Sequence, residues 1–141
     1  MDVERSDPFL NEGRPCHTIP GPEASESTIA KTDEGHERIE HAFEKYFYRT
    51  DYVDVDDDQE ESHEFEIIVW HANVTRYLLC RALQMPSEAW LRFCNLNCSL
   101  MTYLTIRPTR SVSCRMFGDI GHLPYPKATF SGHHGYIDII I

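Results

Sequence analysis

A short apolar run that ends on a histidine, followed at once by a helical pattern, constrains the fold more than any other part of the sequence. The run covers residues 65–70 and is rich in β-branched and aromatic side chains. It is too short for a helix and too continuous for a half-exposed strand, so it predicts a strand buried on both faces of a parallel sheet. After His71 the apolar residues Val74, Tyr77, Leu78 and Ala82 recur at helical spacing, which predicts a helix whose Arg76 and Arg81 point away from the core.

This strand–turn–helix unit places His71 at the carboxyl end of a strand and the N–H groups of Ala72, Asn73 and Val74 at a helix N-terminus. Open α/β sheets bind ligands at that edge, and unpaired N–H groups together with the helix dipole favour an anion such as phosphate. A hydrogen-bonded structural histidine is the alternative at such a position.

The composition is that of an ordinary soluble globular protein, and the α/β pattern of the central unit requires only one domain. At 141 residues it is long enough for one hydrophobic core. The formal net charge of −10, without a basic patch, argues against a nucleic-acid partner, because an acidic surface repels the phosphate backbone. The five cysteines, an odd number at low density, predict reduced thiols. No apolar run is long enough to cross a bilayer, so no transmembrane segment is predicted.

The remaining segments have weaker patterns. Residues 1–32 are rich in Pro, Gly, Ser and Glu and predict an irregular segment, and residues 33–49 predict a helix capped by Thr32 or Asp33. His36 and His41 on that helix are predicted to lie at the surface. A short helix over residues 88–93 and an antiparallel hairpin formed by residues 99–107 and 111–117 follow the central unit. Residues 136–141 suggest only a sticky terminal strand.

No metal site is predicted. The acidic loop at residues 51–64 contains Asp54, Asp56 and Asp58, which begin like a calcium-binding EF-hand loop. However, Gln59 stands where that loop requires glycine, and Phe65 stands where it requires a bidentate glutamate. A solvated surface loop is therefore the preferred interpretation. The cysteine pair in the hairpin region has CxxxC spacing, and no further ligands complete a zinc site.

Two long blocks carry a family resemblance. The sequences WHANVTRYLLCRALQMPSEAWLRF and SLMTYLTIRPTRSVSCRMFGDIGHLP closely resemble the second half of the mitochondrial serine/threonine phosphatases in the phosphoglycerate mutase-like branch of the histidine phosphatase superfamily. Upstream, SDPFLNEGRP and GHERIEHAFEKYF extend the resemblance. It implies the C-terminal part of a three-layer α/β/α fold. The implied organisation is an irregular segment at 1–32 with a Glu-Gly-x-Pro loop, a partial phosphatase domain at 33–124 and a divergent tail at 125–141.

The resemblance also implies a chemistry. Such enzymes hydrolyse phosphoserine and phosphothreonine in proteins through a phosphohistidine intermediate, with no metal and no other cofactor. His71 matches the second histidine, which contacts the phosphoryl group, and Glu12 matches the glutamate that protonates the leaving group. The amides of Ala72 and Asn73 would help to bind the anion. Without the resemblance, Glu12 would be interpreted as a solvated loop residue.

One part of the family signature is missing. The nucleophilic histidine of these enzymes stands in an Arg-His-Gly sequence after the first strand, and no histidine here has that setting. We therefore expect a C-terminal half that is inactive alone, or alternatively a non-catalytic remnant that keeps only protein contacts, in a family whose members form oligomers. The resemblance implies the mitochondrial outer membrane. Because the anchor is absent from this sequence, the cytosol remains an alternative.

Overall fold

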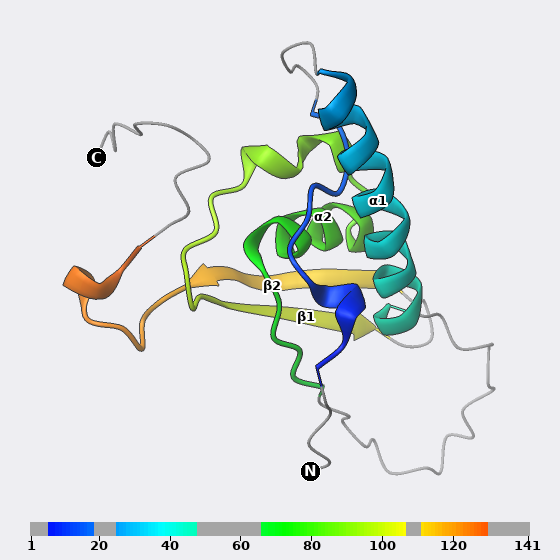
Figure 1. Cartoon of the computed structure of the whole chain (residues 1–141). Coiled ribbons are helices and arrows are strands. Elements are labelled where there is room, and N and C mark those ends of the chain that lie inside the picture. Colours follow the sequence, from blue (N-terminus) through cyan, green and yellow to red (C-terminus); the bar gives the residue numbers. More distant parts are fainter. Residues whose placement is uncertain (1–5, 19–24, 48–65, 107–110, 130–141) are drawn as a thin grey trace, which may run out of the picture.

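Two helices and one antiparallel hairpin dominate the computed structural model, which describes residues 6–18, 25–47, 66–106 and 111–129. Figure 1 shows α1 and α2 against each other, with the hairpin beside them. The presence of both helices and strands confirms the predicted α/β class. In chain order the elements are η1 Pro8–Leu10, α1 Glu26–Tyr46, α2 Ala72–Ala82, η2 Ser87–Arg92, β1 Leu100–Ile106, β2 Ser111–Asp119 and η3 Tyr125–Lys127.

Helix α1 begins at Glu26, earlier than the predicted start at residue 33. The residue in the cap position is Ser25, whose carbonyl accepts the amide of Ile29 at 3.0 Å. Serine is a favourable residue at a helix start, and Glu26 in the first turn complements the positive end of the helix dipole. Thr32, the predicted cap, is instead a buried residue inside the helix.

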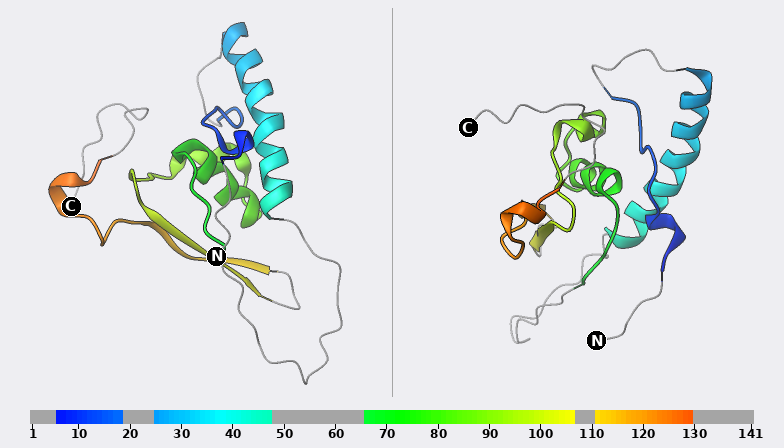
Figure 2. Two further views of the ribbon diagram at one scale, coloured as in Figure 1. Left: turned by 60° about the horizontal axis from the view of Figure 1, so that its bottom comes forward. Right: turned by 60° about the vertical axis from the view of Figure 1, so that its left-hand side comes forward.

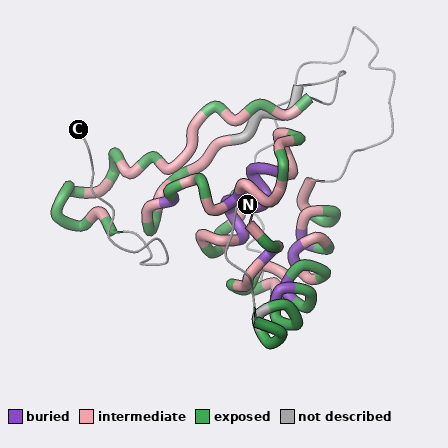
Figure 3. The backbone as a smooth tube through the Cα atoms, turned by 90° about the horizontal axis from the view of Figure 1, so that it is seen from above, coloured by how far each residue is buried: buried purple, intermediate pink, exposed green. Residues whose placement is uncertain are grey.

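The core lies between α1 and α2. Ile39 of α1 is fully buried, and Trp90 of η2 closes the cluster from the other side. Figure 3 shows the burial concentrated in α2. The predicted helix after His71 is thus confirmed, and its buried residues are Val74, Thr75, Arg76, Tyr77, Leu78, Leu79 and Cys80.

Arg76 does not point to solvent as the periodicity predicted. The residue is 1% exposed, and its guanidinium lies over the Trp90 ring, 5.8 Å from the ring centroid. Its Nε donates to the carbonyl of Ala72 at 3.1 Å. Because η2 covers the side of α2 that would otherwise face water, the guanidinium is enclosed with polar and aromatic partners. Burial lowers the pKa of Arg76.

The predicted buried strand is the main correction. Residues 66–70 are described, and they form no strand; Ile67 is 72% exposed and Val69 is 86% exposed. A strand buried on both faces needs a neighbour on each side and a layer over each face. In the described ranges the sheet has only β1 and β2, which pair with each other. Trp70, at the end of the segment, stacks on Phe47 with ring centroids 6.1 Å apart.

The hairpin and the short helix agree with the sequence. β1 and β2 pair antiparallel from Leu100↔Asp119 to Ile106↔Ser111, with irregular register near Thr102. The short helix is a 3₁₀ helix, and its Trp90 donates from Nε1 to the carbonyl of Cys16 at 3.2 Å. The acidic loop with its calcium hypothesis and the terminal strand at 136–141 lie outside the described residues.

A glycine in the middle of α1 allows the N-terminal segment to pass. Gly35 is buried, and a Cβ atom added there would lie 2.6 Å from the carbonyl oxygen of Arg14. Backbone must therefore move if any side chain is added. This contact explains why a residue with low helix propensity occupies a helix interior.

We predict that Gly35→Ala destabilises the protein by about 1–3 kcal/mol, the usual cost of overpacking. In an unobstructed helix the same change would stabilise by up to about 1 kcal/mol. Urea unfolding followed by circular dichroism measures the difference. Asp33→Ala, at an exposed position of the same helix, is the matched control and should change stability little. A more stable Gly35→Ala variant would contradict the close contact.

Candidate functional site

The segment from Asp7 to Pro15 lies along one side of α1 and runs opposite to the helix. Figure 2 shows it beside α1 in both views. Four contacts set the register: Asp7 with Lys45, Phe9 with His41, Glu12 with Arg38, and Arg14 with Gly35. The helix residues follow one another at intervals of three or four, so they share one face. We call residues 7–15 the Glu12 loop.

Asp7 fixes the start of this loop. Its Oδ1 accepts the amide of Phe9 at 2.9 Å, and its Oδ2 accepts Lys45 Nζ at 2.7 Å and the Tyr46 hydroxyl at 2.6 Å. The hydrogen bonds from Lys45, Tyr46 and Phe9 lower the pKa of Asp7 to about 2. Next to it, the Phe9 ring packs on His41 with centroids 4.4 Å apart. The loop therefore has a defined starting position on α1.

Glu12 is exposed in the middle of the loop. Its Oε1 accepts the amide of Gly13 at 3.0 Å, and its backbone carbonyl accepts Arg38 Nη2 at 3.1 Å. The residue lines a hollow of about 340 Å³ on the surface, together with Asn11, Gly13, Lys31, Glu34, Gly35 and Arg38. A carboxyl group placed in this way can exchange a proton with a molecule in solution.

His71 occupies the cap position of α2 but does not cap the helix with its side chain. Its backbone is extended, with φ −91° and ψ 160°, and the residue is exposed. Its carbonyl accepts the amide and the hydroxyl of Thr75, each at 2.9 Å. The imidazole makes no hydrogen bond with any residue that the structure describes.

Ala72 and Asn73 follow His71 as the first residues of α2, and both are half-buried. Amides in the first turn of a helix have no partner within the helix, so they are available to an anion. The Oδ1 atom of Asn73 is buried and has no hydrogen-bond partner. The start of α2 thus combines an exposed imidazole with backbone donors.

No hydrogen bond between the described residues joins the two parts of the predicted site, Glu12 and His71. Burial lowers the pKa of Arg76, and the negative charge of Glu12 opposes that effect. The Arg76 side chain also reaches the first turn of α2, where its Nε donates to the carbonyl of Ala72.

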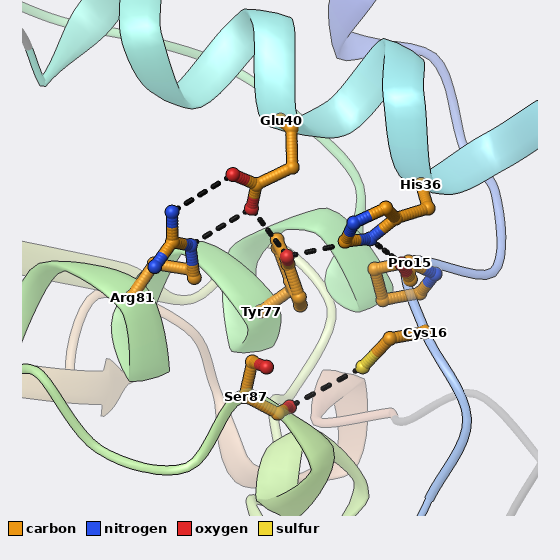
Figure 4. Close-up of polar contacts among 7 residues, drawn as sticks. All are labelled: Pro15, Cys16, His36, Glu40, Tyr77, Arg81 and Ser87. Carbon is orange, nitrogen blue, oxygen red and sulfur yellow. Dashed lines mark hydrogen bonds and ion pairs between the residues drawn. The ribbon is translucent and has the colours of Figure 1, made fainter. Parts of the chain in front are cut away.

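A polar network that the sequence did not predict joins α1 to α2 (Figure 4). Arg81 donates from Nε and Nη2 to the two carboxylate oxygens of Glu40, each at 2.8 Å, and the Tyr77 hydroxyl donates to Glu40 as well. Burial alone would raise the pKa of Glu40, but the hydrogen bonds from Arg81 and Tyr77 lower it overall. Burial and the bond to Glu40 raise the pKa of Tyr77.

His36 extends this network to the Glu12 loop. Its Nδ1 lies 2.8 Å from the carbonyl oxygen of Pro15 and 3.5 Å from the Tyr77 hydroxyl. The expected surface position of His36 is confirmed, since the residue is exposed, but its ring has a partner. No sequence spacing could have revealed these contacts, because 41 residues separate Glu40 from Arg81.

Two kinds of feature are absent from the described ranges. No group of three or more His, Cys, Asp or Glu side chains in them could hold a metal ion. None of their helices is long and apolar enough to span a membrane.

The chain is similar to a set of known phosphatases. The chain is related to protein phosphatases: over 126 residues it is 44% identical to the mitochondrial serine/threonine-protein phosphatase Pgam5 of Caenorhabditis elegans, a match that covers 89% of this chain and 42% of that protein. Against the human PGAM5 phosphatase it is 40% identical over 123 residues, covering 87% and 40%. By sequence the chain is similar to one part of these mitochondrial serine/threonine phosphatases, which confirms the predicted resemblance.

The match is partial in length. The chain spans about two fifths of each of these two relatives. Among solved structures, the crystal structure of phosphoglycerate mutase from Plasmodium falciparum matches with 34% sequence identity and a TM-score of 0.49, over 89% of this chain and 59% of that one. No protein-family model matches the chain.

We predict that the contact between Asp7 and its partners makes stability depend on pH in the acid range. The pKa of Asp7 is about 2 in the folded protein, whereas an unfolded aspartate has a value of about 4. A lowered pKa means that the stabilising effect is complete above about pH 4 and is lost as pH falls toward 2. The unfolding free energies of wild type and Asp7→Asn should differ most at neutral pH and converge near pH 2. A difference that is constant from pH 7 to pH 2 would contradict this assignment.

Proposed function

We propose that this chain forms the His71-bearing part of a phosphatase that removes phosphate from phosphoserine and phosphothreonine in proteins through a phosphohistidine intermediate. The observation that carries the proposal is the exposed imidazole of His71, free of hydrogen bonds to the described residues, at the start of α2 beside first-turn amides that have no partner within the helix. The names of the relatives, which are serine/threonine phosphatases, support the reaction class. Because they are also named mitochondrial, we propose the same compartment.

In this proposal each residue has one task at the phosphoryl group. The His71 imidazole donates a hydrogen bond to a phosphoryl oxygen, and the amides of Ala72 and Asn73 bind the same anion. Phosphoryl transfer spreads negative charge over the equatorial oxygens, and fixed donors at that position stabilise the transition state. Glu12 gives its proton to the serine or threonine oxygen as the bond to phosphorus breaks.

In this proposal, none of the residues of this sequence acts as the nucleophile. A phosphohistidine forms when an imidazole nitrogen attacks phosphorus, and the Arg-His-Gly signature that would supply it is absent here. The chain alone would then bind phosphate weakly and turn nothing over. The second candidate, a non-catalytic protein-interaction module, is favoured by the same absence and by the exposed apolar side chains of Ile67 and Val69.

We predict no phosphatase activity above background for this chain alone, with either a phosphoserine peptide or 4-nitrophenyl phosphate as substrate. The measurement is release of inorganic phosphate. The His71→Ala variant should give the same baseline. Turnover by the wild-type chain that His71→Ala abolishes would show that His71 itself is the nucleophile.

A chimera tests the individual roles. This chain would replace the matching residues of the Caenorhabditis elegans relative, which supplies the rest of the phosphatase. We predict that His71→Ala and Glu12→Ala both lower turnover of a phosphoserine peptide, Glu12→Ala by about 10²- to 10⁴-fold, the usual effect of general acid catalysis. Glu12→Ala should affect 4-nitrophenyl phosphate much less, because that leaving group needs little protonation.

Glu37→Ala is the matched control for Glu12→Ala, since Glu37 is an exposed glutamate of α1 that does not line the hollow. It should leave both substrates unaffected. Equal losses on both substrates in Glu12→Ala would exclude Glu12 as the acid. A chimera that is inactive on both substrates would favour the interaction module.

A further inference from the structure

Arg38 of α1 binds the backbone of the Glu12 loop at several points. Its Nη1 lies 2.6 Å from the carbonyl oxygen of Asn11, 2.8 Å from that of Phe9 and 3.4 Å from that of Pro8. Its Nη2 lies 3.1 Å from the carbonyl oxygen of Glu12. One side chain therefore donates hydrogen bonds to four carbonyl groups within residues 8–12 of the loop.

The arrangement uses properties that only arginine has. The guanidinium carries five N–H donors in a rigid plane, so it can serve several acceptors in a fixed geometry. In most surface loops such carbonyls are hydrogen-bonded to water, and the loop backbone is mobile. Here the acceptors point at one cation on a helix, which fixes the middle of the loop, between the end held by Asp7 and the end held against Gly35.

Gly13 completes the arrangement. A Cβ atom at this position would lie 2.5 Å from Arg38 Nη2, so a residue without a side chain is needed directly after Glu12 for the guanidinium to reach the Glu12 carbonyl. The contact is to the backbone of Glu12, and these two side chains form no ion pair. An ion pair would favour the charged carboxylate and oppose its action as a proton donor.

We propose that Arg38 is a positioning residue for the acid step: by holding the backbone of the Glu12 loop, it places the Glu12 carboxyl group at the leaving oxygen. This inference rests on the proposed function for its catalytic consequence. The structural part, that Arg38 holds the loop in place, stands on the four distances alone.

The structural part is tested on this chain by native-state cleavage with a glutamyl-specific protease. Cleavage between Glu12 and Gly13 requires the loop to open, so its rate follows the population of the open form. Arg38→Met keeps the apolar stem and removes the donors, and we expect cleavage about tenfold faster, or more. Arg38→Lys, with one nitrogen, should lie between wild type and Arg38→Met. Mass spectrometry of the peptides that end at Glu12, residues 1–12 and, after cleavage at Glu4, residues 5–12, reports this site.

Arg115→Met is the matched control, because Arg115 is an exposed arginine of β2 on the hairpin. Its cleavage rate should equal that of wild type. Circular dichroism of each variant checks that the helices remain formed. An unchanged rate in a folded Arg38→Met protein would overturn the inference, and so would an equal increase in Arg115→Met.

The catalytic part is tested in the chimera with both substrates. Arg38→Met should lower turnover of the phosphoserine peptide by about 10²-fold, since a displacement of about 1 Å can have that effect, and should largely spare 4-nitrophenyl phosphate. Added to Glu12→Ala, it should cause little further loss on the peptide, because the group that it positions is already absent. Arg38→Lys should recover part of the activity.

The two failures can be told apart. If Glu12→Ala reduces both substrates equally, the proposed role of Glu12 is wrong, whatever the protease experiment shows. If Glu12→Ala has the leaving-group dependence but Arg38→Met reduces both substrates equally, Arg38 supports the fold and does not position the acid. A double variant whose losses simply multiply would lead to the same conclusion.

Discussion

The contact of Glu40 with Arg81 and Tyr77 holds together the two parts of the candidate site. Helix α1 carries the Glu12 loop along one face, and α2 carries His71 at its start, so the relative position of Glu12 and His71 depends on how these helices meet. Two hydrogen bonds of 2.8 Å between Glu40 and Arg81 set both the distance and the relative orientation of the two helices at this contact. Packing of Ile39 against α2 supplies apolar contact, which is less directional. The half-buried carboxylate of Glu40, with three donors, therefore sets how the two helices lie against each other.

Helix α1 is therefore not an ordinary amphipathic helix with one side in water. One face contacts α2 through Ile39, Glu40 and Phe43, and a second face holds the Glu12 loop through Arg38 and Lys45. On the second face Arg38 binds backbone carbonyls and Lys45 binds a carboxylate. A charged stripe on a helix can thus serve as a binding surface for the protein's own chain.

The sequence predicted which segments form helices and strands better than it predicted which residues they contact. The periodicity after His71 and the β-rich runs around residues 108–110 fix local structure, and α2 and the hairpin formed where expected. The predicted strand at residues 65–70 was wrong for the described residues 66–70, because a run of apolar residues cannot specify its pairing partners. His71 and its helix start follow from local pattern, whereas Glu12 came from family resemblance. Arg38 and Glu40 escaped prediction because their partners lie 26 to 41 residues away in the chain.

The bare start of α2 has a consequence for how this region could change in evolution or in design. Serine, aspartate and asparagine are the residues that best close a helix start, and their loss usually costs a helix about 1 kcal/mol. This chain has a histidine there, and its ring makes no capping bond. Position 71 is thus one where His71→Ser or His71→Asp is expected to make the helix more stable while removing the imidazole. Selection for stability would favour a capping residue at position 71, whereas selection for phosphate chemistry would favour histidine. Related chains that keep a histidine at this position would be the ones whose function requires the imidazole ring.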